Sequence, residues 1–120
     1  MRLALAAAAL ALLAVPAGAQ SLTGVGAEGN WGCRANIDGT RAGLLTIYAG
    51  AYGYASVNYG SKASGTGLVE MASNGVTFLD GNLPAGAGII TAILGFDDAG
   101  KDVLLLYTSE RNVLTCRPTK

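Results

Sequence analysis

The segment GLVEMASNGVTFLDG, from Gly67 to Gly81, predicts two strands joined by a tight turn. Asn74-Gly75 is the strongest hairpin signal in the chain, because both residue types tolerate the positive φ of two-residue β-turns. Gly67–Ala72 forms the first predicted strand. Val76 and Phe78 lie two residues apart on the second strand and therefore share one of its faces. The segment is thus expected to fold as an antiparallel hairpin with one apolar face.

Short strands separated by turn signals continue the pattern on both sides of this hairpin. The expected strands are Asn30–Ala35, Leu44–Tyr48, Tyr52–Tyr54, Gly67–Ala72, Val76–Phe78, Ile89–Phe96, Val103–Tyr107 and Val113–Arg117. A spacing of roughly 8–12 residues between strands is typical of a β-barrel or β-sandwich. The 18 glycines and 3 prolines disfavour helices, and Pro84–Gly88 is expected to be a flexible connection. The predicted fold is all-β: a small antiparallel up-and-down barrel, or a barrel-like sandwich, of about eight strands.

The two cysteines, Cys33 and Cys116, lie near the two ends of the strand pattern. In an oxidising compartment such an isolated pair most simply forms one disulfide, and the alternative is two free thiols. A disulfide would make the first and last strands neighbours, which favours a closed or nearly closed sheet. Two cysteines without any histidine do not complete a tetrahedral zinc site.

The N-terminal segment has the three parts of a secretory signal peptide. Arg2 precedes the apolar run Leu3–Val15, and Ala17-Gly18-Ala19 offers the small residues of a cleavage site. We expect cleavage near Ala19, a flexible leader over residues 20–29, and a single β-barrel domain over residues 30–120. The apolar run is too short for a membrane span, which needs about 20 residues. The expected location is the bacterial periplasm or the extracellular medium.

Charge and composition argue against several functional classes. Without residues 1–19 the net charge is near −1, and no segment gathers basic residues as nucleic-acid binding or polybasic membrane adhesion requires. The absence of histidine removes the usual general base at neutral pH. Asp97, Asp98 and Asp102 most simply form a solvated turn. We therefore expect no enzymatic activity, no cofactor and no metal.

Two groups of residues are candidates for binding. The segment YGSKASGTGL, residues 59–68, combines hydroxyl groups, one lysine and small residues; its candidate binding residues are Tyr59, Ser61, Lys62, Ser64 and Thr66. The other interpretation is a plain connection between two strands. Tyr52 and Tyr54 share one strand face and could form an exposed aromatic surface, since tyrosine is enriched in binding contacts. Alternatively, this face belongs to the barrel interior.

Four short motifs resemble the periplasmic and membrane-bound inhibitors of c-type lysozyme. They are Trp31-Gly32-Cys33, Ala63-Ser64-Gly65, Gly75-Val76-Thr77-Phe78-Leu79-Asp80-Gly81 and Leu114-Thr115-Cys116. The resemblance implies an eight-stranded antiparallel barrel stapled between its ends. It also implies that Ser64 would enter the lysozyme active-site cleft. The family has a lysine before the second-motif glycine, where this chain has Asp80.

These observations predict a monomeric, non-enzymatic, secreted binding domain. A protein target such as a c-type lysozyme would be bound through the residue 59–66 loop. The alternatives are a barrel that binds a small apolar ligand, with Gly43, Gly53 or Gly95 facing inward to open space, and a structural envelope-associated domain without a discrete site.

Overall fold

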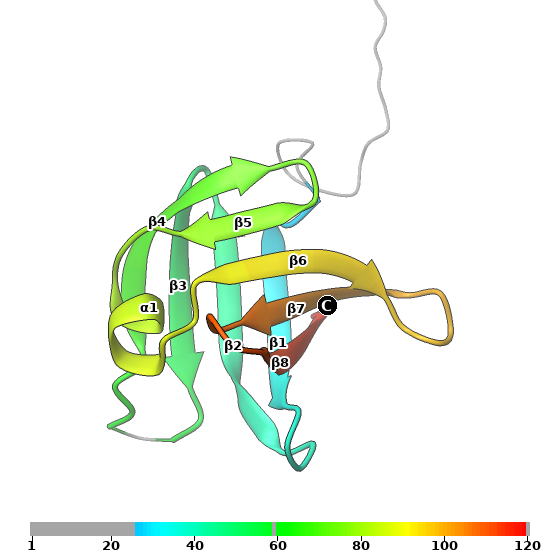
Figure 1. Cartoon of the computed structure of the whole chain (residues 1–120), viewed down its shortest axis with the longest axis horizontal. Helices are drawn as coiled ribbons and strands as arrows, with labels where there is room; N and C mark the ends of the chain where they lie inside the picture. Colours follow the sequence, from blue (N-terminus) through cyan, green and yellow to red (C-terminus); the bar gives the residue numbers. More distant parts are fainter. Residues whose placement is uncertain (1–25, 59, 120) are drawn as a thin grey trace, which may run out of the picture.

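Eight antiparallel strands close into a barrel in the computed structural model, which describes residues 26–58 and 60–119 (Figure 1). Each strand pairs with the next one along the chain, and the last pairs with the first. The elements are β1 (Gly29–Ala35), β2 (Arg41–Tyr48), β3 (Ala51–Ser56), β4 (Gly65–Ala72), β5 (Gly75–Phe78), α1 (Asn82–Ala87), β6 (Thr91–Phe96), β7 (Asp102–Tyr107) and β8 (Asn112–Pro118). The prediction of an up-and-down barrel is confirmed. The predicted signal peptide lies outside the described residues.

The Gly67–Gly81 segment forms the predicted hairpin between β4 and β5. Its register pairs Ala72 with Gly75 and Val69 with Phe78, so the turn falls at Ser73-Asn74. A Cβ atom at Gly75 would collide with the carbonyl oxygen of Ala92 on β6. Glycine is therefore required here by close strand approach. The turn lies one residue before the predicted Asn74-Gly75 pair, and Gly75 is the first residue of β5.

Large side chains fill the barrel interior. The most deeply buried are Leu45, Ile47, Leu83, Leu104, Leu106 and Cys116. Tyr52 and Tyr54 are also inside, at 3% and 7% exposure, and the Tyr52 ring meets Phe78 edge-on with centroids 5.0 Å apart. The two tyrosines share a face as predicted, but this face is the core, so the hypothesis of an exposed aromatic surface is wrong. Alternation alone does not say which face of a strand is buried.

The inward-facing glycines do not open a ligand chamber. Gly43 is buried, and a Cβ atom built on it would lie 2.6 Å from Cζ and the hydroxyl oxygen of Tyr54, so this ring already occupies the space. Gly53 pairs with exposed Thr66, and a Cβ at Gly95 would contact Leu105 and Val103, which alternate along β7 with the core residues Leu104 and Leu106. Gly53 and Gly95 therefore face outward, contrary to the expectation.

A disulfide joins Cys33 on β1 to Cys116 on β8, and the two residues are direct register partners. Both are buried, at 3% and 0% exposure. The predicted disulfide and the predicted adjacency of first and last strands are confirmed. The bridge lies inside the barrel at the seam where the sheet closes.

The connection between β5 and β6 contains the short helix α1, where we expected a flexible segment. Leu83 is fully buried, and Pro84 lies in the first helical turn, where no backbone N–H needs a partner. Gly88 ends the helix in the left-handed conformation, and its N–H donates to the carbonyl of Pro84. Strand β6 accordingly begins at Thr91, two residues after the expected start. Six residues long, α1 is the one helix in the described part of the chain, and it has neither the length nor the apolar content of a membrane span.

Residues 26–28 pack against the barrel, although residues 20–29 were expected to be a flexible leader. Ala27 is fully buried, and its carbonyl oxygen accepts a hydrogen bond from Trp31 Nε1 at 2.9 Å. Glu28 is 5% exposed and accepts a hydrogen bond from the backbone N–H of Ala49 at 2.7 Å. The folded domain therefore includes residues before Asn30.

Candidate functional site

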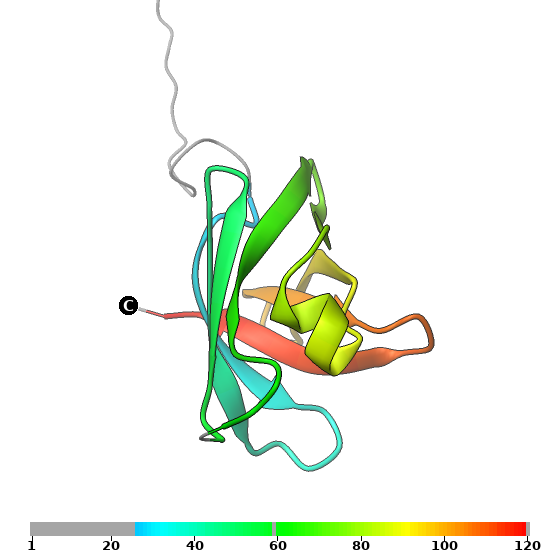
Figure 2. The ribbon, with the colours of Figure 1, turned by 90° about the vertical axis from the view of Figure 1, so that its left-hand side faces the viewer.

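Four chain connections meet at one end of the barrel, which we call the α1 end. They are residues 36–40, residues 57–64 (with Tyr59 outside the described residues), the α1 segment, and residues 108–111. Figure 2 shows the β1–β2 hairpin and the β3–β4 connection extending below α1. All four contribute to one open cavity of about 290 Å³, which we call the mouth cavity. It is lined by Ala35, Thr40, Arg41, Ala42, Tyr54, Ser56, Asn58, Ala63, Ala87, Ile89, Thr108, Val113 and Leu114.

Tyr54 reaches from the core into this cavity. The Cα of Tyr54 pairs with Leu45, but the phenol end of its side chain lies against Gly43. Gly43 pairs with Ser56, which is two residues closer to the α1 end along β3. The side chain is therefore directed along the barrel axis towards the mouth. Its hydroxyl makes no hydrogen bond to any residue that the structure describes, although Tyr54 is only 7% exposed. Burial raises the pKa of the Tyr54 phenol, so the group stays protonated and acts as a donor at neutral pH.

The other interior tyrosine has a structural role. Tyr52 donates its hydroxyl proton to the carbonyl of Asp80 at 3.0 Å and accepts the N–H of Leu83 at 3.0 Å. These bonds tie the start of α1 to the core. Buried polar groups are nearly always paired, as the Tyr52 hydroxyl is. The Tyr54 hydroxyl, which has no partner among the described residues, is therefore unusual.

Hydrogen bonds of its own polar groups fix the conformation of the predicted binding loop. Ser64 Oγ accepts the N–H of Ser56 at 2.9 Å, and the Ser64 carbonyl accepts a hydrogen bond from the Asn82 side chain. Ser61 Oγ accepts the N–H of Ala63 at 3.1 Å, and Ala63 packs against the core. Ser61 and Ser64 therefore shape the connection, and neither hydroxyl projects freely from it.

The remaining predicted loop residues are dispersed. Lys62 is exposed beside α1, where a Cβ atom at Gly86 would collide with the Lys62 carbonyl oxygen. Thr66 belongs to β4 and faces the outer surface opposite Gly53, so it is not part of the loop. Tyr59 lies outside the described residues. Of the predicted set, Lys62 is the exposed charged group at the α1 end.

Sequence reasoning missed most of the exposed residues at this end. Ile37, at the tip of the β1–β2 hairpin, is 90% exposed, the largest exposure among the large hydrophobic residues that the structure describes. The predicted Asp38-Gly39 turn was the available signal, because an apolar residue beside an exposed turn has little to pack against. Arg111 and Ile37 also line an open groove of about 500 Å³ next to the mouth cavity.

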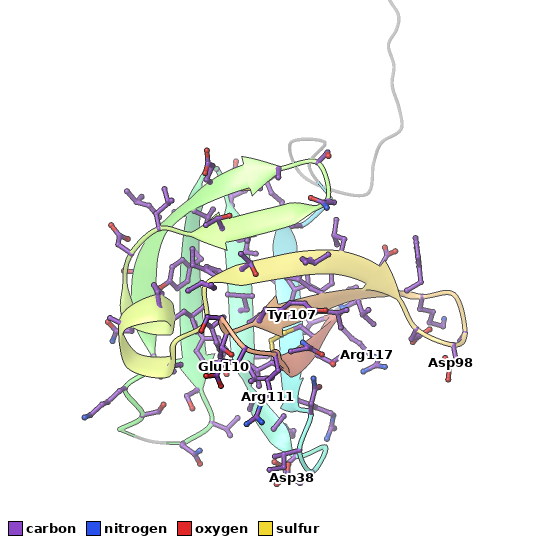
Figure 3. All side chains as sticks on the ribbon, in the orientation of Figure 1. Asp38, Asp98, Tyr107, Glu110, Arg111 and Arg117 are labelled. Atoms are coloured by element: carbon purple, nitrogen blue, oxygen red, sulfur yellow. A yellow bond between two sulfur atoms is a disulfide. The ribbon has the colours of Figure 1, made fainter. Side chains whose placement is uncertain are left out.

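Charge is distributed unevenly between the two ends of the barrel. Basic side chains at or beside the α1 end are Arg34, Arg41, Lys62 and Arg111, against the acidic Asp38, Asp80 and Glu110. Figure 3 shows Glu110 and Arg111 at the β7–β8 turn and Asp38 at the tip of the β1–β2 hairpin. The opposite end carries Asp97, Asp98, Lys101 and Asp102 in and beside the β6–β7 turn. The one ion pair recorded for the described residues, Asp97 with Arg117 at 3.6 Å, belongs to that opposite end.

The described residues contain no group of three or more His, Cys, Asp or Glu side chains that could hold a metal ion. Comparison of the chain with protein-family models, with curated protein sequences and with solved structures finds no match.

Proposed function

We propose that this protein is a non-enzymatic, secreted binding domain that engages another protein through its α1 end. The observation that carries the proposal is the combination of an almost fully exposed Ile37 with surplus basic side chains on connections that meet at one end of a barrel. The interior is filled by side chains, which leaves the barrel ends and outer face for recognition. A buried disulfide suits an oxidising compartment such as the periplasm.

The composition of the α1 end fits a protein interface. Arginine side chains are enriched in such contacts, and an exposed isoleucine beside arginines offers both an apolar anchor and charge complementarity. The surplus of basic groups favours an acidic partner surface, since opposite charges raise the association rate and select the partner. The rigid hydrogen bonds of Ser61 and Ser64 reduce the ordering cost of binding.

A c-type lysozyme is the partner that the motif resemblance favours, because its active-site cleft presents catalytic carboxylates. On this proposal the contact is made by Lys62 and neighbouring residues of the α1 end, while the Ser64 hydroxyl supports the loop from behind. Asp80, which replaces the lysine of the family, accepts a hydrogen bond from the N–H of Leu68 at 2.9 Å. The Asp80 carboxylate therefore binds the β4 backbone in the barrel wall, and on this proposal it does not take over the lysozyme contact of the family's lysine.

Calorimetric titration of the protein into a c-type lysozyme tests this proposal. The variants are Ile37→Ser, Lys62→Ala and Arg111→Ala, each exposed and remote from the core, with Lys101→Ala at the opposite end as the matched control. We expect binding that weakens about tenfold or more for at least one α1-end variant and is unchanged for Lys101→Ala. Absence of heat at micromolar concentrations would eliminate lysozyme as partner. If only Lys101→Ala weakens binding, the interface lies at the β6–β7 end and the proposal is refuted.

A further inference from the structure

The Tyr54 hydroxyl is a buried donor directed into a cavity and without a hydrogen-bond partner in the described part of the chain. Buried donors of this kind are rare, because leaving one unpaired costs about 1–3 kcal/mol. Tyrosine is also not needed for packing alone, since phenylalanine would fill the same space above Gly43. The arrangement suits a group that accepts a hydrogen bond inside the mouth cavity.

The rest of the lining defines what can carry that acceptor. Most of the lining side chains are apolar, and the four alanines keep the opening wide. The hydroxyl groups of Ser56 and Thr108 are already engaged: Ser56 Oγ accepts the N–H of Asn58, and Thr108 Oγ1 accepts the N–H of Glu110. Tyr54 thus offers a free buried donor beside a largely apolar wall, and the exposed side chains of Arg41 and Asn58 lie at the rim. This arrangement is complementary to an apolar body with a polar group at one end.

The size of the mouth cavity matches a small ring. It measures about 290 Å³. Ligand sites usually span about 300–1,000 Å³, and a cavity of about 150 Å³ already holds benzene. One ring with a short substituent therefore fits inside it.

Charge favours an anionic acceptor. Arg41 is the one charged residue among the described residues that line the cavity, and it forms no ion pair with them. We propose that the mouth cavity binds a small ring carboxylate, with the ring against the alanine-rich wall and the carboxylate accepting a hydrogen bond from the Tyr54 hydroxyl on the side of Arg41. This site goes beyond the proposed protein-binding function and does not depend on it.

Three probes of equal size test the proposal: benzoate, neutral benzamide and cationic benzylamine. Each is titrated into the full protein while the methyl resonances of the four lining alanines are followed by NMR. We expect saturable shifts of these methyl groups with benzoate, weaker binding of benzamide and none of benzylamine. Tyr54→Phe should weaken benzoate binding about tenfold or more, as expected for a lost hydrogen bond to a charged group, whereas Tyr48→Phe on the outer surface should leave it unchanged.

Two further variants test the role of charge and the access to the cavity. Arg41→Gln should abolish the preference for benzoate over benzamide, and Ala87→Leu, on the exposed side of α1, should block the opening to all three probes. Absence of methyl shifts at millimolar benzoate would overturn the proposal, as would equal benzoate affinity of Tyr54→Phe and the unmodified protein. Because no protein partner is present, failure here leaves the lysozyme titration as a separate test.

Discussion

Removing the Cys33–Cys116 disulfide should lower the stability of the barrel by about 4.5 kcal/mol. The two residues are separated by 83 positions, so the bridge restricts almost the whole folded chain. For a loop of this length the loop-entropy relation gives a denatured-state entropy loss of about 15 cal/mol/K, or about 4.5 kcal/mol at 298 K. For a domain of this size the same change corresponds to a decrease in Tm of about 18 °C or more.

Urea unfolding measured by tryptophan fluorescence provides the assay. Trp31 is the single tryptophan, is 3% exposed, and lies two residues from Cys33, so its emission reports exposure of the core. The oxidised protein is compared with the reduced protein, which keeps both sulfur atoms in the core, and with the Cys33→Ala/Cys116→Ala variant. The double variant should lose the same 4.5 kcal/mol plus a packing loss, and should not respond to reductant.

A reduced protein within about 1.5 kcal/mol of the oxidised one would refute this reasoning. It would mean that the β1–β8 seam is already restricted in the unfolded chain, so the bridge removes little freedom. A double variant much less stable than the reduced protein would instead assign the main role of the sulfur atoms to packing, because both lie inside the core.

Three other changes have defined outcomes. Tyr52→Phe should cost about 1–3 kcal/mol in the same urea assay, because it leaves the buried Leu83 N–H and the part-buried Asp80 carbonyl without their partner. Gly86→Val should separate α1 from the Lys62 backbone, and hydrogen exchange should then accelerate in the β3–β4 connection but not in β7. In the folded protein a backbone hydrogen bond from Lys101, followed by weaker contributions, lowers the pKa of Asp97 below its ordinary 3.8. Ionised Asp97 therefore stabilises the fold above that value and loses this effect as pH falls through its folded pKa. The stability difference between the protein and Asp97→Asn should accordingly disappear towards pH 2, and a difference that persists there would contradict this assignment.

The strand pattern was predictable because turn chemistry and alternation are local properties. Asn74-Gly75 and Asp38-Gly39 determine hairpins within a few residues, and both hairpins form. The helix α1 was not predictable in this way, since its six residues are too few to show helical periodicity and include both proline and glycine. It forms because Leu83 inserts into the core and Tyr52, some 31 positions earlier, binds the Leu83 N–H.

The candidate site depended on contacts that the sequence does not display. Tyr52 and Tyr54 could be assigned to one face, but only the barrel register shows that this face is interior. The free Tyr54 hydroxyl results from Gly43 on the neighbouring strand, which leaves room for the ring to extend towards the mouth. Ser64 looked like a contact residue because the backbone N–H that its hydroxyl accepts belongs to Ser56 on β3, whereas Ser61 accepts the N–H of Ala63 within the same connection.

The small residues of the β3–β4 connection have a physical explanation in the packing around α1. Any side chain on Gly86 would meet the Lys62 backbone, and Ala63 is small enough to enter the core edge while still bounding the mouth cavity. Further inside the barrel, Leu45, Leu104 and Leu106 are fully buried, whereas the α1 end holds the mouth cavity. Small side chains at the α1 end bury less apolar area, and each Å² not buried lowers the stability by about 25 cal/mol. Larger residues at Gly86 or Ala63 would collide with their neighbours, so close packing between α1 and the β3–β4 connection is enough to explain the small residues.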